Sequence, residues 1–179
     1  MGVVPGTVSS MPLAEPSFLA RLRQGPRPDT TPKNPHTQLT QNAPPDFQER
    51  VFAFVSSLPG VVVGPSAVSV PGARAFRLPD SRQHAREAFM VGREFAHLHP
   101  AGDGSLHMAL APEIVDRVIE NGWAERHPLA GRFGLPDNIV MVYGPRDDDE
   151  LAVVEELVRA SHRLATGRPA QARRGVLDR

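Results

Sequence analysis

The chain has 179 residues, of which 40% are hydrophobic, so it is long enough for one domain with appendages and apolar enough for a core. Lysine plus arginine and aspartate plus glutamate both number 20, and without net charge or a long basic block the chain is not expected to bind nucleic acid. The lack of cysteine excludes disulfides, zinc–thiolate sites and a thiol nucleophile, and the lack of a signal-like or long apolar stretch predicts a cytoplasmic protein without a membrane span.

Proline and polar residues dominate the N-terminal segment. Six prolines between positions 26 and 45 interrupt a polar stretch, so this segment cannot form a core of its own. We expect residues 1–33 to be disordered or extended, apart from a marginal helix in PSFLARLR, and residues 26–45 to form an extended strap. Residues 168–179 are polar and basic and are expected to form a flexible tail. The predicted folded domain therefore covers residues 34–167.

An amphipathic helix and a set of short strands follow. Asp46 and Glu49 form a capping-box pattern that predicts the start of the helix, which Pro59 and Gly60 end. From position 61 to position 99, short β-type runs (VVV, AVSV, AFRL, AFMV and EFAHLH) separated by glycine, proline and aspartate predict a strand meander. The turn AGDG then leads into SLHMAL, whose alternation predicts a hairpin with one face in the core. The apolar face of the helix comprises Phe47, Val51, Phe54, Val55 and Leu58.

Two more helices and a buried strand complete the predicted order. Pro112 begins a helix that Gly122 ends, and IVMVYGP is an uninterrupted apolar strand. The acidic run from Asp147 to Glu150 then begins a last helix with a broad apolar stripe. This order of helices and antiparallel strands predicts an α+β fold, a two-layer antiparallel sheet with helices packed on one side.

Histidines are concentrated in the middle of the chain. Four of the seven, His97, His99, His107 and His127, lie within about thirty residues. Strand alternation predicts that His97 and His99 share one face with Phe95, and the hairpin brings His107 close to them. Three imidazoles are therefore expected to converge on one face of the sheet.

Three interpretations of the histidines stay open from the residues alone. Neutral imidazoles could bind zinc or non-haem iron, with Glu94, Asp103 or Glu125 as a carboxylate partner. They could act without metal, as a general base and as hydrogen-bond donors to a developing oxyanion, because imidazole titrates near physiological pH. They could also be ordinary polar residues on a half-exposed sheet face, satisfied by backbone and water.

The candidates for contact with a substrate are Glu94, Asp103, Ser105, Trp123, Glu125, Tyr143 and Arg146. Ser105 lies near Asp103, but no G-x-S-x-G elbow surrounds it, and Asp-Gly-Ser is an ordinary turn sequence. Trp123 fits a core anchor at a helix–strand corner better than a ligand platform. Tyr143 could be a catalytic phenol or could close the core with its hydroxyl in water. Arg146 could hold a carboxylate or enolate, or pair with the acidic run that follows it.

Three strings in the order EFAHLHPAGDGSLHMAL, GWAERHPLAG and IVMVYGPRDDDELAVVEELVRAS resemble the luciferase domain of fungal luciferases and many uncharacterised bacterial and fungal proteins. The resemblance covers roughly residues 34–165. In the fungal members oxygen is added to a hydroxylated hispidin, a pyrone, with loss of carbon dioxide and emission of light. The resemblance therefore implies oxygenation of an electron-rich enol without flavin or nicotinamide, with molecular oxygen as co-substrate. The four clustered histidines match histidines of the family pattern and are the best candidates for the base.

The resemblance leads to a primary functional hypothesis and an alternative. The primary hypothesis is a cofactor-independent, oxygenase-like enzyme that acts on a small enolisable aromatic or pyrone-type compound. The alternative is a non-catalytic module that binds a small molecule or a protein on the same sheet face. The order of elements also resembles small α+β proteins of the MmcQ/YjbR type, often discussed as binding modules.

We also expect no tightly bound metal. The chemistry implied by the resemblance needs none, and the two-residue spacing of His97 and His99 forces their rings to tilt together to share one ion. Instead, at least two of His97, His99 and His107 are predicted to be hydrogen-bonded to carboxylates or backbone.

Overall fold

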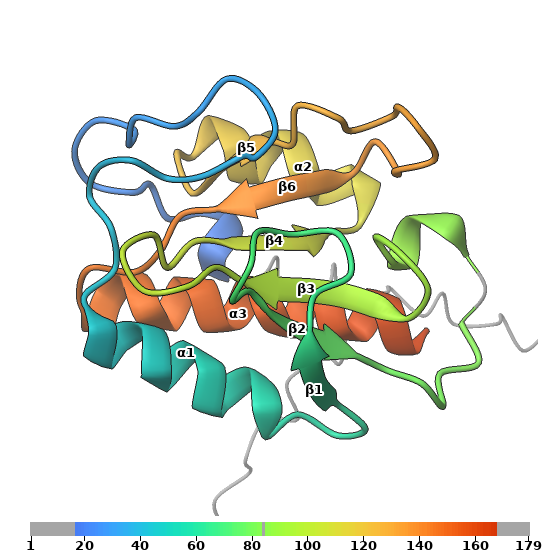
Figure 1. Ribbon diagram of the computed structural model, residues 1–179. Coiled ribbons are helices and arrows are strands. Elements are labelled where there is room, and N and C mark those ends of the chain that lie inside the picture. Colours follow the sequence, from blue (N-terminus) through green and yellow to red (C-terminus); the bar gives the residue numbers. More distant parts are fainter. Residues whose placement is uncertain (1–16, 84, 168–179) are drawn as a thin grey trace, which may run out of the picture.

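A six-stranded antiparallel sheet forms the centre of the molecule (Figure 1). The computed structural model describes residues 17–83 and 85–167 of the chain. The strands follow the order β1-β2-β3-β4-β6-β5, and every neighbouring pair is antiparallel. They are β1 (Val62–Pro65), β2 (Arg74–Arg77), β3 (Glu94–Leu98), β4 (Leu106–Ala109), β5 (Ala124–Arg126) and β6 (Ile139–Val142).

Helices pack on one side of this sheet. They are α1 (Pro45–Ser56), α2 (Pro112–Glu120) and α3 (Asp148–Thr166), and short 3-10 turns form at Ser17–Leu19 and Arg86–Ala88. In Figure 1, α3 runs behind the sheet with α1 beside it. Residues of all three helices join one hydrophobic cluster with the sheet, which confirms the predicted α+β fold. None of the helices in the described part of the chain is long and apolar enough to cross a bilayer.

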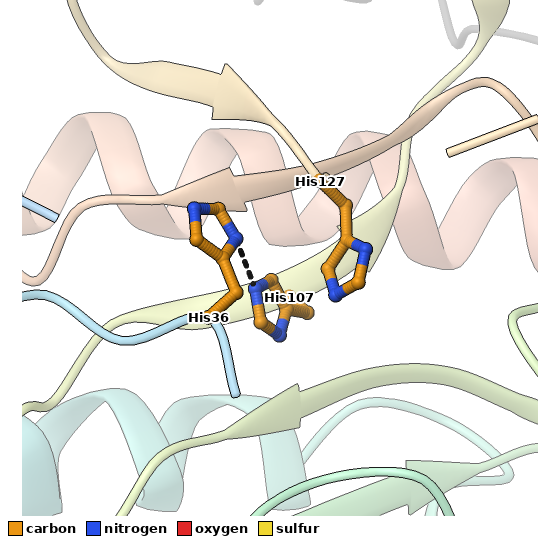
Figure 2. Close-up of side chains that lie close together, drawn as sticks. All are labelled: His36, His107 and His127. Atoms are coloured by element: carbon orange, nitrogen blue, oxygen red, sulfur yellow. Dashed lines mark hydrogen bonds between the residues drawn. The ribbon is translucent and has the colours of Figure 1, made fainter. Parts of the chain in front are cut away.

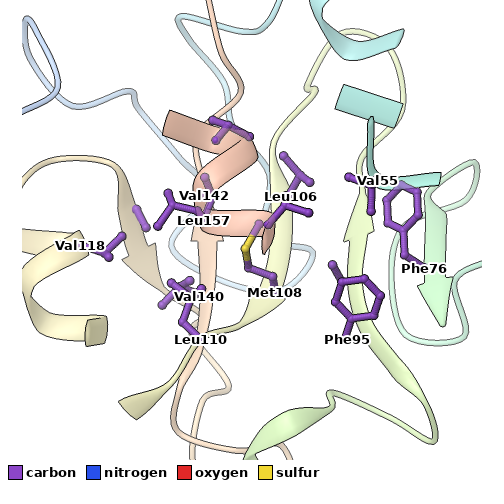
Figure 3. Packing of buried hydrophobic residues seen from close by; sticks show 14 of the residues in the cluster. Val55, Phe76, Phe95, Leu106, Met108, Leu110, Val118, Val140, Val142 and Leu157 are labelled. Carbon is purple, nitrogen blue, oxygen red and sulfur yellow. The ribbon is translucent and has the colours of Figure 1, made fainter. Parts of the chain in front are cut away.

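Side chains of the central strands point alternately to the two faces of the sheet, and the two faces differ chemically. Leu106 and Met108 of β4 lie in the helical cluster, where Figure 3 shows them near Leu157 of α3. Between them, His107 is opposite His97 of β3 and points to the other face. All residues of β3 and β4 are nevertheless buried. The interpretation of the histidines as residues of a half-exposed face is therefore wrong for His97, His99 and His107, whereas His127 is partly buried.

The strap covers the second face. Thr30 and Gln38 form an isolated antiparallel bridge, and the Gln38 side chain accepts a hydrogen bond from the Gly144 backbone N–H at 3.0 Å. Further along the chain, Asn42 donates to the Gly102 carbonyl in the β3–β4 turn. These contacts hold the extended segment across the ends of β4 and β6, as predicted for a strap.

The N-terminal residues before the strap contribute to the core. Phe18 is buried in the helical cluster, although the PSFLARLR string forms only a three-residue 3-10 turn there. Of residues 1–33, which are expected to be disordered or extended, 1–16 lie outside the described residues, and so does the expected flexible tail at 168–179. The domain boundary at residue 34 stays a prediction.

A β-bulge corrects the predicted facing of Phe95. The register of β2 with β3 shifts between Phe76 and Arg77, so that Arg77 pairs with Glu94 while Phe76 pairs with Ala96. The extra residue, Phe95, turns into the helical cluster and contacts His162 of α3. Phe95 therefore does not share a face with the histidines. The same irregularity places Glu94 beside His97.

Two of the predicted strands do not form. The AVSV run lies in bends between β1 and β2, because antiparallel neighbours need a chain reversal there. The AFMV run begins at the last residue of the 3-10 turn Arg86–Ala88. Gly92, with φ of 54°, then reverses the chain, so that Val91 forms a bridge with Glu94. Their apolar side chains instead line a pocket, as described below.

The helix starts also differ from one another. The predicted capping box at Asp46 is wrong, because α1 begins at Pro45 after Pro44 and has no side-chain cap hydrogen bond. Proline at the first helical position has no N–H that needs a cap. In contrast, Asp147 caps α3 by accepting a hydrogen bond from the Glu150 N–H at 2.8 Å.

The two aspartates give a matched test of this difference. Asp147→Ala is expected to lower the free energy of unfolding by about 0.5–2 kcal/mol, because it removes a helix cap. Asp46→Ala removes no cap hydrogen bond and is expected to cost less than about 0.5 kcal/mol. Urea denaturation of both variants measures the difference, and equal losses would contradict the assignment.

Candidate functional site

A pocket of about 600 Å³ opens on the face of the sheet opposite the helices. Its floor carries imidazoles, and its rim is mostly apolar. The histidines that line it are His36, His97, His99, His107 and His127. The apolar residues that line it include Val68, Val70, Met90, Leu129, Phe133 and Leu135.

Four different parts of the chain supply these histidines. His97 on β3 and His107 on β4 are directly opposite each other in the antiparallel register, so their side chains are neighbours. His99 follows β3 by one residue, and His127 follows β5. His36 comes from the strap. Figure 2 shows His36 and His127 on either side of His107.

A chain of hydrogen bonds runs through three of the rings and ends on a carboxylate at each side. His97 Nδ1 donates to Glu94 Oε1 at 2.8 Å, and His97 Nε2 lies 3.0 Å from His107 Nδ1. His107 Nε2 lies 3.0 Å from His36 Nδ1, the contact dashed in Figure 2, and His36 Nε2 donates to Glu125 Oε1 at 2.5 Å. Each ring therefore uses both nitrogens.

His99 has a separate carboxylate partner. Its Nδ1 donates to Asp103 Oδ2 at 2.6 Å, and the Ser105 backbone N–H and hydroxyl both donate to Asp103 Oδ1. His97 and His99 thus confirm the prediction that at least two of the three histidines bond to carboxylates or backbone. The Nε2 atom of His99 is buried and has no hydrogen-bond partner among the described residues.

His127 is held in the opposite tautomer. Its Nδ1 accepts a hydrogen bond from the Leu129 backbone N–H at 3.1 Å, so the neutral ring carries its hydrogen on Nε2. Its ring meets that of His107 edge-on, with centroids 4.7 Å apart. At this pocket wall His127 therefore offers a donor, whereas His99 offers a lone pair.

Burial favours the neutral form of His97, His107 and His127. It lowers the pKa of His107 well below the usual value, and the surrounding imidazoles lower it further. Burial also lowers the pKa of His97, although Glu94 opposes the shift, and it lowers the pKa of His127 to about 4. At neutral pH these rings are therefore bases or ligands rather than cations.

The carboxylates stay ionised for a different reason. Burial alone would raise their pKa values, but several hydrogen bonds and nearby charges together outweigh it, and the largest of these contributions is the bond from a histidine. The bond from His97 lowers the pKa of Glu94, the bond from His99 lowers that of Asp103, and the bond from His36 lowers that of Glu125. Each carboxylate therefore acts as an acceptor that fixes the orientation of a ring.

The other predicted site residues have different positions. Ser105 lies beside the cluster as a partner of Asp103, and Tyr143 donates its hydroxyl hydrogen to Glu125 Oε2 at 3.0 Å. Burial and Glu125 raise the pKa of Tyr143. Trp123 and Arg146 do not line the histidine pocket.

Those last two residues lie together at a smaller pocket of about 380 Å³. Trp123 is buried and donates its indole N–H to the Arg21 carbonyl at 2.6 Å. Arg146 pairs with Glu150 and donates to Gln41 Oε1 at 2.7 Å, which ties the strap to α3.

His36 is the site residue that the sequence did not indicate. It lies 71 residues before His107, in a polar stretch with neither a helical nor a strand period. No local pattern could therefore have identified it. Its role follows only from the path of the strap over the sheet.

The fold and the site define an α+β protein with a buried, carboxylate-supported histidine cluster at the bottom of a pocket. Residues 92–161 match the family model of the luciferase domain. Luciferases of Armillaria gallica and Armillaria ostoyae are 45% identical to the chain over 80 residues, and that of Neonothopanus nambi is 44% identical over 80 residues. The aligned stretch covers 44% of this chain but only 30% of each luciferase.

Through this segment the chain is similar to the luciferase-domain family. The matched residues hold β3, β4, α2, β5 and β6 and most of α3, and they include four of the five pocket histidines. His36 lies outside the match. No solved structure matches the chain, so the likeness to the MmcQ/YjbR type stays a prediction.

The lowered pKa of His127 predicts a loss of stability in acid. Unfolded imidazoles, with a pKa of about 6.5, take up protons that the folded ring, with a pKa of about 4, does not. Because the unfolded state binds more protons, the free energy of unfolding should fall as the pH decreases from about 6.5 to 4. Urea denaturation in buffer with EDTA measures it. His127→Gln should flatten the slope, and a wild-type slope of zero would contradict the assignment.

Proposed function

We propose that the chain is an oxygenase-like enzyme that acts on a small enolisable aromatic or pyrone-type compound, with molecular oxygen as co-substrate and without flavin or nicotinamide. One observation carries the proposal: neutral imidazoles in two tautomers meet at the floor of a pocket with an apolar rim. Such a pocket can remove a proton and also shelter the product of that step from water.

The Asp103–His99 pair is the best candidate for the base. Asp103 fixes the hydrogen of His99 on Nδ1, which leaves the Nε2 lone pair free to accept a proton. A base that is itself oriented by a carboxylate is a recurring arrangement in enzymes. Removal of the enol proton would give an electron-rich enolate, the species that reacts with oxygen.

His127 supports the charge that develops on the substrate. Its Nε2–H, fixed by the bond between Leu129 and Nδ1, is a donor for an enolate oxygen at the pocket wall. Donor and acceptor therefore belong to different rings on different strands. Their separation by the sheet geometry lets one substrate contact both.

The size and lining of the pocket suit a flat aromatic compound. Pockets that enclose small molecules measure roughly 300–1,000 Å³, and this one has about 600 Å³. Val68, Val70 and Leu135 at the rim offer apolar contact without competing hydrogen bonds. The likeness to fungal luciferases supports the same class of chemistry. We further propose a small-molecule partner and a cytoplasmic location, the latter from composition alone.

Oxygen consumption with a panel of hydroxylated pyrones tests the proposal. His99→Ala is expected to lower kcat/KM by about 10²–10⁴-fold, as for loss of a general base. His162→Gln is the matched control, because this histidine lies on the helical side and contacts Phe95 rather than the pocket. Equal turnover in wild type and His99→Ala would contradict the proposal.

Mass spectrometry of the recovered compound separates the enzyme from a binding module. An enzyme returns an oxygenated product, whereas a binding module returns the compound unchanged. Both would raise the melting temperature, since any ligand that prefers the native state stabilises it. A bound but unaltered pyrone, under air and at neutral pH, would favour the binding module.

A further inference from the structure

The hydrogen bonds between Glu94 and Glu125 require more hydrogens than the neutral rings can supply. Four bonds connect the two carboxylates through His97, His107 and His36. Each bond needs one hydrogen, but each neutral imidazole carries only one on its ring nitrogens, and an ionised carboxylate carries none. Three hydrogens are therefore available for four bonds.

The missing hydrogen belongs beside His107. Both carboxylate bonds must hold a hydrogen from the ring, because an ionised carboxylate only accepts. His97 therefore donates to Glu94, His36 donates to Glu125, and His107 has one hydrogen for two neighbours. The rings of His107 and His36 are nearly parallel, 17° apart, and we assign the hydrogen of His107 to its bond with His36. The lone pairs of His97 Nε2 and His107 Nδ1 then face each other at 3.0 Å.

His99 contributes a further ring nitrogen to this cluster. The buried Nε2 of His99 has no hydrogen-bond partner among the described residues, since Asp103 occupies Nδ1. The His99 ring is parallel to that of His97, at an interplanar angle of 12°, and edge-on to that of His107. One ring nitrogen from each of the three residues lies within 4.8 Å of the others.

We propose that His97 Nε2, His99 Nε2 and His107 Nδ1 together bind one divalent first-row transition metal ion of the zinc or iron class. Three neutral imidazoles with an open position toward a pocket are a common ligand set for such ions. An additional proton between His97 and His107 would repair their contact but would leave His99 Nε2 unpartnered. A metal ion satisfies all three nitrogens at once.

The surroundings have the form of a metal site. Metal-binding histidines nearly always donate the N–H of their other ring nitrogen to a carboxylate or carbonyl, which fixes the ring. Glu94 does this for His97, and Asp103 does it for His99. For His107 the strap supplies His36, which is itself held by Glu125. With the ion bound, every hydrogen bond of the cluster has one hydrogen and every ring stays neutral.

A second group of nitrogens, from His36, His107 and His127, is also close enough to share an ion. It lacks the necessary lone pairs. His127 Nδ1 accepts from the Leu129 N–H, so its Nε2 carries the hydrogen, and His36 Nδ1 already accepts from His107 Nε2. His127 therefore lines the same pocket without being a ligand, which makes it a matched control.

The proposal departs from the sequence-based expectation of no tightly bound metal. That expectation rested on the chemistry implied by the resemblance and on the tilt that His97 and His99 would need, but one ring nitrogen of each already lies within 4.8 Å of the other. The metal site goes beyond the proposed function and does not depend on any substrate. If both hold, the ion would lower the pKa of an enol at the open position, and solvent water rather than His99 would accept the proton.

Metal binding to the full, untagged chain tests the site. The protein is treated with chelator, freed of it, and titrated with Zn²⁺ or Co²⁺, with elemental analysis and the visible spectrum of Co²⁺ as readouts. About one ion per chain is expected for the three-histidine site. Asp103→Asn should weaken metal binding by about 10–100-fold, because it removes the carboxylate that accepts the Nδ1 hydrogen of the ligand His99. His99→Ala should abolish it, and His127→Ala should retain it.

The same samples are used to check that each variant is folded. Circular dichroism compares the variants, and Zn²⁺ should raise the melting temperature of wild type and His127→Ala but not of His99→Ala. Wild type that takes up no ion, or equal uptake in wild type and His99→Ala, would overturn the proposal. If the wild type binds no metal and its nitrogen NMR spectrum shows a charged imidazole, an additional proton rather than a metal ion completes the cluster. Because no substrate is present, a negative oxygenase assay leaves this result unaffected.

Discussion

The pairing of β3 with β4 is the constraint on which the candidate site depends. It sets His97 opposite His107, and the bulge next to it brings Glu94 to the same face. Antiparallel sheets commonly leave one face to water, yet both faces of these strands are buried. A buried face of imidazoles and carboxylates is stable only when its polar atoms are paired. The strap and the hairpin turn supply those partners through His36 and Asp103.

The two faces of the sheet therefore contribute differently: one mainly stabilises the fold, and the other carries the candidate site. The helical side holds the apolar cluster of Figure 3, which provides the favourable free energy of burial. The histidine side contributes less to stability, because each buried polar group must recover its lost hydration through hydrogen bonds. Proteins tolerate such arrangements mainly at functional sites. Two nitrogen lone pairs that face each other, together with the unpartnered Nε2 of His99, mark this cluster as such a site.

Residues of the candidate site come from two parts of the chain, the segment 92–161 that matches the luciferase domain and the strap. Residues 92–161 contain the hairpin, the three carboxylates and four histidines, whereas His36 lies outside the match. The segment shared with the fungal luciferases thus carries the proposed ligands and the pocket donor. The strap supplies the ring behind His107 and part of the pocket wall. A change in the strap would therefore alter the orientation of His107 without altering the sheet.

The sequence by itself determined the element order, the β3–β4 hairpin and the proximity of His97, His99 and His107, because these follow from local periodicity and a tight turn. It also placed Glu94 near His97 and Asp103 near His99, because these pairs are only three and four residues apart. Tertiary structure alone decided the rest. The bulge at Phe95 depends on cross-strand register, and the place of His36 depends on a segment 71 residues from its partner. The ring tautomers depend on which backbone and carboxylate groups surround each imidazole, and no sequence pattern encodes that environment.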